Sequence, residues 1–213
     1  MSSETLPTNL TLEAFLKACL DFKNTVDEVS LDSYDVKAVG TWSVISLLGH
    51  VFRGLASTLT YLNSGQSDVQ PQVRTAEEFY SAVNLKDPKL LDRVEMGGIN
   101  EGELSRDNLV IHFEEIVEKL QMKLFDVDLK AVIVIMNEIT IPVEEYLKIR
   151  TVELTVHLLD LCTALGLKFR PSTQALKVCV EVMVGCSNQY EKMINLVAAL
   201  SGRQFDPKEL SIF

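Results

Sequence analysis

Three side chains in this sequence have the types and the spacing to bind one divalent metal ion: His50, Glu153 and His157. Glu153 and His157 are four residues apart, so in an α-helix they project from one face as neighbours. A carboxylate and an imidazole placed in this way can share a metal. If His50 comes from a facing helix, three protein ligands leave a position open for water or substrate, as in catalytic rather than structural zinc sites.

The sequence around these residues decides between a metal site and a simpler interpretation. Glu and His four residues apart often do no more than pair on a solvated helix surface, and a lone buried His is usually a satisfied core residue. The segments 46–52 and 153–161 are, however, too apolar for solvated surfaces, and a partly buried imidazole or carboxylate needs a partner. We therefore favour convergence on a metal. The third histidine, His112, precedes two glutamates and is expected in a structural or surface position.

The charge and the apolar runs exclude several classes of function. The formal net charge is −10, whereas binding of nucleic acid needs clustered Lys and Arg. No basic run is present that could bind an anionic membrane surface. Residues 1–9 lack the apolar core of a signal peptide, and the longest apolar run, 131–136, is too short to span a bilayer. We therefore expect a cytoplasmic protein that binds neither nucleic acid nor membrane.

The cysteines also fit a cytoplasmic protein. They lie among apolar residues at helical spacing, where a free Cys behaves as a small core hydrophobe, and a disulfide framework is not expected at this length and cysteine density. Cys162 lies five residues after His157, which places it well around the helix from the candidate site. We expect all four cysteines in the core: Cys19, Cys162, Cys179 and Cys186.

Apolar residues recur at helical spacing in five long segments, and the length suits a single domain spanning 1–213. Prolines and glycines predict a long crossover loop over 63–104, with a short helix near 75–83 opened by a capping box. The β-branched segment 131–141 predicts a short strand or extended chain. The long helices predict an all-α four-helix bundle, in which facing helices commonly build metal sites. The long helices are expected over 11–26, 43–63, 107–125, 142–165 and 172–201.

Four motifs follow one another in the sequence: Trp42-Ser43-Val44, Leu47-Leu48-Gly49-His50, Arg150-x-x-Glu153-x-x-x-His157-x-x-Asp160-Leu161 and Ala164-Leu165-Gly166. Their order and spacing resemble the mycothiol-dependent maleylpyruvate isomerase N-terminal domain family, which belongs to the DinB-like metal-binding four-helix bundles. The resemblance runs from residue 42 to residue 166 and so covers most of the chain. It implies that His50, Glu153 and His157 bind a divalent metal, generally zinc.

The same resemblance implies a transferase or isomerase that uses mycothiol, a low-molecular-weight thiol, on a small electrophilic substrate. Bound zinc (Zn2+) would lower the pKa of the thiol and hold it as a thiolate nucleophile. Arg150 and Asp160 would orient the ligating side chains, and a surface helix ion pair is the equally weighted alternative for these two residues. The alternative function is a non-catalytic, regulatory bundle that binds metal or a ligand. We favour the enzyme, as a monomer or homodimer.

Overall fold

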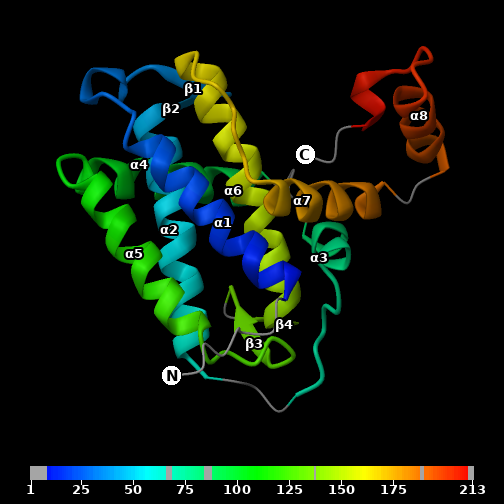
Figure 1. Cartoon of the computed structure of the whole chain (residues 1–213), viewed down its shortest axis with the longest axis horizontal. Coiled ribbons are helices and arrows are strands. Elements are labelled where there is room, and N and C mark those ends of the chain that lie inside the picture. Colours follow the sequence, from blue (N-terminus) through cyan, green and yellow to red (C-terminus); the bar gives the residue numbers. More distant parts are fainter. Residues whose placement is uncertain (1–8, 66–68, 84–87, 137, 188–189, 211–213) are drawn as a thin grey trace, which may run out of the picture.

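Four long helices form a bundle in the computed structural model (Figure 1), which describes residues 9–65, 69–83, 88–136, 138–187 and 190–210. Each of the four packs against two others, because α1 and α2 both contact α5 and α6. This arrangement confirms the all-α bundle that the sequence predicts. The bundle helices are α1 (Leu10–Val26), α2 (Val44–Asn63), α5 (Leu109–Leu124) and α6 (Val143–Leu165).

Local sequence signals begin and end these helices. The side chain of Asn9 caps α1 by accepting a hydrogen bond from the amide of Thr11. Ser43 caps α2 in the same way, because its side chain accepts a hydrogen bond from the amide of Ser46. Gly166 ends α6 in the left-handed region at φ 65°, which glycine adopts without steric cost.

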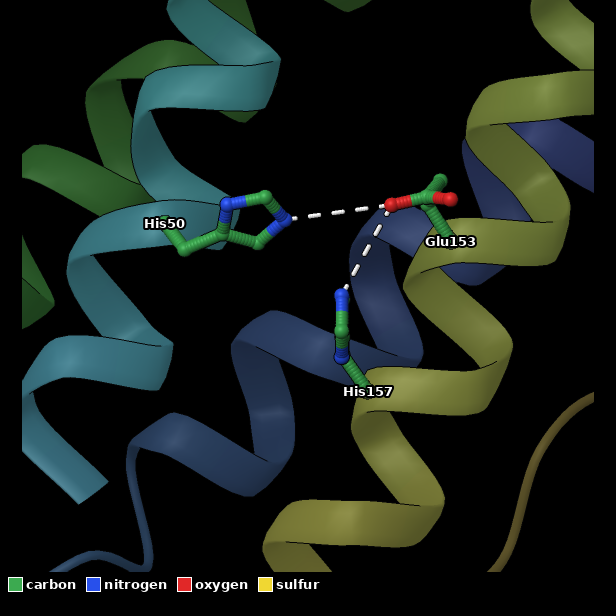
Figure 2. Close-up of side chains that lie close together, drawn as sticks. All are labelled: His50, Glu153 and His157. Carbon is green, nitrogen blue, oxygen red and sulfur yellow. Dashed lines mark ion pairs between the residues drawn. The ribbon is translucent and has the colours of Figure 1, made fainter. Parts of the chain in front are cut away.

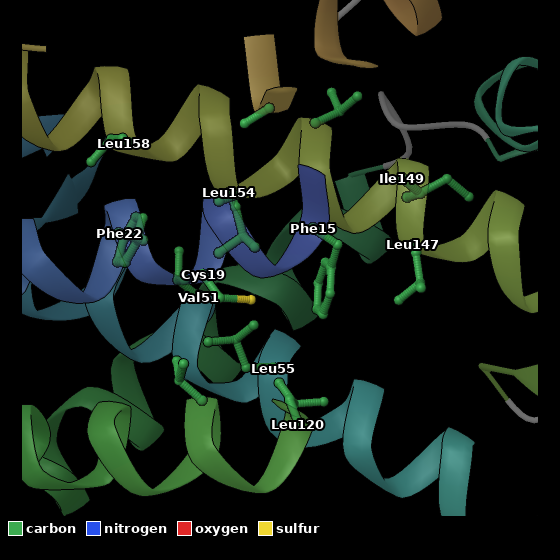
Figure 3. Packing of buried hydrophobic residues seen from close by; sticks show 14 of the residues in the cluster. Phe15, Cys19, Phe22, Val51, Leu55, Leu120, Leu147, Ile149, Leu154 and Leu158 are labelled. Carbon is green, nitrogen blue, oxygen red and sulfur yellow. The ribbon is translucent and has the colours of Figure 1, made fainter. Parts of the chain in front are cut away.

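The core lies where the apolar stripes of the bundle helices meet (Figure 3). The ring of Phe22 on α1 stacks on Phe113 of α5, with centroids 5.6 Å apart. Cys19 is buried beside them as a free thiol, as the sequence predicts. None of the helices in the described residues is long and apolar enough to cross a membrane.

The prediction of a crossover loop over 63–104 is wrong for much of that segment. The short helix expected within it is confirmed as α3 (Ala76–Ala82), capped by Thr75. A further helix that the sequence does not predict, α4 (Pro88–Ser105), packs along the outside of α2 (Figure 1). The glycines of this segment are loop signals in the sequence, but in the structure they permit close packing of two helices.

α2 and α4 approach so closely that several positions have no space for a side chain. A Cβ atom on Gly98 would lie 2.8 Å from the carbonyl oxygen of Ser46, and one on Gly102 would overlap the carbonyl of Ile45. A Cβ atom on Gly49 would overlap the backbone of α4 at both glycines. Glycine at these positions therefore sets the distance between the helices and the position of the middle of α2.

Two short antiparallel hairpins lie at opposite ends of the bundle (Figure 1). β3 (Val132–Ile135) pairs with β4 (Ile139–Pro142), which confirms the extended segment predicted near 131–141. β1 (Lys37–Val39) pairs with β2 (Trp42–Ser43) directly before α2 begins. Two 3-10 helices are also present: η1 (Leu31–Ser33) and η2 (Pro207–Leu210).

The predicted C-terminal helix over 172–201 is two helices instead of one. α7 (Thr173–Cys186) packs on α1 and α6, and α8 (Tyr190–Leu200) extends away from the bundle (Figure 1). α7 ends at Cys186, one residue after Gly185. A Cβ atom on Gly185 would come within 2.7 Å of the Glu77 side chain of α3, so the glycine also permits close packing of α7 on α3.

We predict that Gly49→Ala lowers the free energy of unfolding by about 2 kcal/mol, because its Cβ would overlap backbone atoms of α4 that cannot move independently. Urea denaturation followed by circular dichroism measures the change. The control is Thr60→Ala on the exposed side of the same helix, which should change stability by less than about 0.5 kcal/mol. Equal stabilities of Gly49→Ala and the wild type would contradict the close packing of α2 on α4.

Candidate metal centre

His50 on α2 faces Glu153 and His157 on α6 across the seam between the two helices (Figure 2). Nε2 of His50 lies 3.8 Å from Oε2 of Glu153, and Nε2 of His157 lies 3.6 Å from the same oxygen. The three donor atoms all lie within 4.8 Å of one another. Two atoms that bind one zinc ion at about 2.1 Å can be at most roughly 4.2 Å apart. Both His–Glu pairs therefore fit a shared ion, and the histidine pair needs at most a small movement.

The first half of α2 is held in place around His50. The amide of Ile45 donates a hydrogen bond to the carbonyl of Tyr34, which ties the start of the helix to the segment before it. On the side of α4, a Cβ atom on Gly98 would lie 3.1 Å from Cβ of His50. The imidazole is therefore placed by rigid neighbours on two sides.

The indole of Trp42, on β2, covers one side of the cluster. Its ring centroid lies 5.0 Å from that of His50 and 6.3 Å from that of His157. Sequence reasoning gives Trp42 no role in the site, although it directly precedes the cap of α2. An aromatic residue in that position is a usable signal, because a hairpin that ends at a helix cap can fold the ring back over the helix.

The cluster is sheltered but remains open to solvent. The side chains of His50, His157 and Glu153 are 13%, 17% and 23% exposed. Nδ1 of His50 is buried and has no hydrogen-bond partner in the described part of the chain. The orientation of this imidazole therefore depends on its packing against Trp42 and on the interaction of Nε2 with Glu153.

Asp160 contacts the other nitrogen of His157. Its Oδ2 lies 3.1 Å from Nδ1, and because a carboxylate can only accept a hydrogen bond, Nδ1 is assigned the proton. Nε2 is then the atom that faces Glu153. A carboxylate on the far nitrogen is the arrangement that orients metal-binding histidines in proteins. The position of Asp160 therefore suits the role that the sequence analysis gives it.

Arg150 lies on the same helix as Glu153 and His157. Within the described residues its guanidinium forms no hydrogen bond and no ion pair, so its predicted role in orienting the ligands stays a prediction. It lies against Gly54 of α2, where a Cβ atom would overlap Nη2. Its positive charge still acts on Glu153 and favours the ionised carboxylate.

Burial and charge set the protonation of the cluster. Burial raises the pKa of Glu153, but hydrogen bonds with both histidines and the nearby positive charges outweigh it and hold this pKa well below its usual value. Burial lowers the pKa of His157, but the carboxylates of Asp160 and Glu153 outweigh it and raise this pKa to about 9. For His50, burial dominates and lowers the pKa. Without metal at neutral pH, Glu153 is ionised, His157 is charged and His50 is neutral.

Sequence reasoning also missed Tyr80, which lies on the predicted short helix α3 but outside the motifs that contain the ligand candidates. Burial, followed by the charge of Glu153, raises the pKa of this tyrosine well above its usual value. The charge of Arg150 acts on it in the opposite direction. These interactions place Tyr80 near the cluster, and nothing in the sequence pattern around it signals that position.

The remaining chemically active residues lie outside the cluster. His112 packs its ring on Phe52 with centroids 5.7 Å apart, which is a structural position. The cysteines are free thiols in apolar surroundings, and burial raises the pKa of each. Three of them are buried, namely Cys19, Cys162 and Cys179. Cys186 is half-buried.

Known structures include one with the predicted fold. The crystal structure of a mycothiol-dependent maleylpyruvate isomerase superposes on this chain with a TM-score of 0.56 and 16% sequence identity, covering 89% of this chain and 73% of that one. A likeness at this identity shows a shared fold, and it agrees with the fold that the motif resemblance implies. No family model matches the sequence, and no curated protein matches it either.

We predict that His157 of the metal-free protein titrates near pH 9 and His50 below its ordinary value, so that the imidazoles carry different charges at neutral pH. Asp160→Asn removes an acceptor that favours the charged imidazole, so the pKa of His157 should fall. NMR titration of the histidine ring signals measures both, with His112 as the control signal. An unchanged titration of His157 in Asp160→Asn would contradict the contact between the two side chains.

Proposed function

We propose that this protein binds one zinc ion through His50, Glu153 and His157, and that it uses a low-molecular-weight thiol to transform a small electrophilic substrate. Its class would be a thiol-dependent transferase or isomerase of the cytoplasm, with mycothiol as the thiol. The observation that carries the proposal is the convergence of three ligand atoms within 4.8 Å from two packed helices. Helix-borne ligands of this kind are held more precisely than ligands on loops.

The fold and the motifs support the choice of thiol. A solved structure with the same fold is a mycothiol-dependent isomerase, and the motif resemblance points to the same thiol. Zinc suits the ligand set, because two imidazoles and one carboxylate form a known catalytic zinc site with an open position. The moderate exposure of the cluster leaves a route by which a thiol could reach it.

The bound metal would lower the pKa of the thiol and hold it as the thiolate that attacks the electrophile. The protein's own residues prepare the site for this. His50 is already neutral, so a shift of its one ring proton to Nδ1 would leave Nε2 free to bind without release of a proton to solvent. His157 must release its Nε2 proton, while Asp160 retains the hydrogen bond to Nδ1 and keeps the ring in position. The indole of Trp42 keeps water from one side of the cluster.

We predict that the purified protein binds about one divalent metal ion per chain, because three ligands supply one catalytic-type site. His50→Ala should lower the affinity at least about 100-fold, since it removes a ligand rather than a supporting group. Metal analysis and competition with a chelator measure stoichiometry and affinity. The matched control is His112→Ala, which removes the histidine that lies on Phe52. Full metal occupancy in His50→Ala, with helix content intact, would contradict the site.

We predict that a low-molecular-weight thiol binds the metal as a thiolate, because zinc-type sites with three protein ligands keep an exchangeable position and thiolate is a soft donor. Replacement of zinc by cobalt gives the readout. A sulfur-to-cobalt charge-transfer band should appear on addition of mycothiol and be absent before it, because the four cysteines lie outside the cluster.

Two other outcomes of this experiment are informative. A band before any thiol is added would place a cysteine on the metal and contradict the structure of the site. A cobalt-loaded protein that gives no band with any thiol would contradict the thiol-dependent enzyme and favour a non-catalytic metal-binding module. Size-exclusion chromatography with light scattering, run on the same samples, decides between a monomer and a homodimer.

A further inference from the structure

The guanidinium of Arg150 is a cation without an anionic partner beside the metal cluster. Arg150 lies three residues before Glu153 on α6, so the two side chains share a face and are separated by a rise of about 4.5 Å. Within the described residues it forms no ion pair and no hydrogen bond, and its Nε is buried. Its charge acts on His50, Glu153 and Tyr80, which places it among the side chains of the site.

Gly54 provides the surface on which this guanidinium lies. It follows His50 by four residues on α2, so both belong to the same helix face. A Cβ atom on Gly54 would overlap Nη2 of Arg150 and lie 2.9 Å from its Cζ. The absence of a side chain at this position therefore lets the guanidinium lie between the two helices.

Within the described part of the chain, the residues next to Arg150 between α2 and α6 supply no counter-ion for its guanidinium. One turn before Arg150, the hydroxyl of Tyr146 lies 3.2 Å from the hydroxyl of Thr58, and both residues are buried. Glu153 is the carboxylate of the site, but it is not within ion-pair distance of Arg150 and already pairs with both histidines. With a metal bound, that carboxylate would be shared with a dication and would neutralise the guanidinium even less.

A partly buried charge without a partner is costly, and an anionic ligand would remove that cost. We infer that Arg150 binds a carboxylate group of the ligand whose other end reaches the metal cluster, an inference that rests on the proposed function. The guanidinium presents a planar fork of donors that matches a carboxylate. The ligand class is thereby narrowed to an electrophile that carries a carboxylate or, in place of mycothiol, which has none, to a thiol that carries one.

The first arm of the test asks whether the thiol carries the carboxylate. Cobalt-loaded protein is titrated with 3-mercaptopropionate and with its neutral isostere 3-mercaptopropionamide, and the charge-transfer band gives both dissociation constants. If the thiol carries the carboxylate, 3-mercaptopropionate should bind about tenfold more tightly, as expected for a hydrogen bond to a charged group.

The second arm asks whether the electrophile carries the carboxylate. Zinc-loaded protein is titrated calorimetrically with crotonate and with crotonamide, in the presence and in the absence of 2-mercaptoethanol. If the electrophile carries the carboxylate, crotonate should bind about tenfold more tightly than crotonamide. Because this arm also runs without thiol, it does not depend on thiol binding.

Three variants connect the preference to the guanidinium. Arg150→Gln removes the charge, and Gly54→Ala displaces the guanidinium while keeping the charge, so both should abolish the preference for the carboxylate. Arg53→Gln is the matched control, because Arg53 lies on Gly97 of α4 and not in the seam between α2 and α6. It should keep the preference in full. Helix content should be unchanged in all three variants. Metal content is measured in parallel, and the dissociation constants are compared at full metal occupancy.

The outcomes separate this inference from the proposed function. No carboxylate preference in either arm, or a preference that persists in Arg150→Gln, would overturn the inference whatever the thiol does. A cobalt-loaded wild type that gives no thiol band would overturn the proposed function, and the crotonate titration would still decide the role of Arg150. A preference in one arm only, lost in Arg150→Gln and Gly54→Ala, identifies the molecule that carries the carboxylate.

Discussion

A buried carboxylate between two imidazoles is the constraint around which the rest of the site is arranged. Glu153 is costly to bury as an anion, and it remains ionised because His157 and Arg150 favour its charged form. His157 is in turn held charged by Asp160. In the metal-free protein the Nε2 proton of His157 therefore occupies the side of the cluster that a metal would occupy. Exchange of that proton for a dication preserves the pairing of Glu153 and needs little movement of the helices.

Such an exchange requires helices that do not move, and the glycines of α2 and α4 meet this requirement. Gly49, Gly98 and Gly102 bring two backbones into contact, so the middle of α2 is fixed on the side away from α6. The segment before the β1–β2 hairpin fixes the start of α2, because the amide of Ile45 donates a hydrogen bond to the carbonyl of Tyr34. The position of His50 therefore depends on packing over a whole helix rather than on a single hydrogen bond.

The sequence predicts those parts of the structure that depend on local patterns. The three ligand candidates follow from helical spacing in apolar surroundings, and their convergence needs only that α2 and α6 are neighbours. α4 could not be predicted, because glycine between helices and glycine in a loop look the same without knowledge of the facing backbone. The contact of Arg150 with Gly54 could not be predicted for a similar reason, since the two residues are almost a hundred positions apart in the chain.

The seam between α2 and α6 has an order that limits what can bind in it. The cluster of candidate metal ligands forms one layer, the guanidinium over Gly54 forms the next, and the hydroxyl pair of Thr58 and Tyr146 forms the third. The third layer is buried and its hydrogen bond is already made, so it has little to gain from a ligand. A ligand that extends from the cluster therefore finds polar partners over only about one helical turn, roughly 5 Å. This distance suits small ligands and favours a short spacing between a metal-binding group and an anionic group.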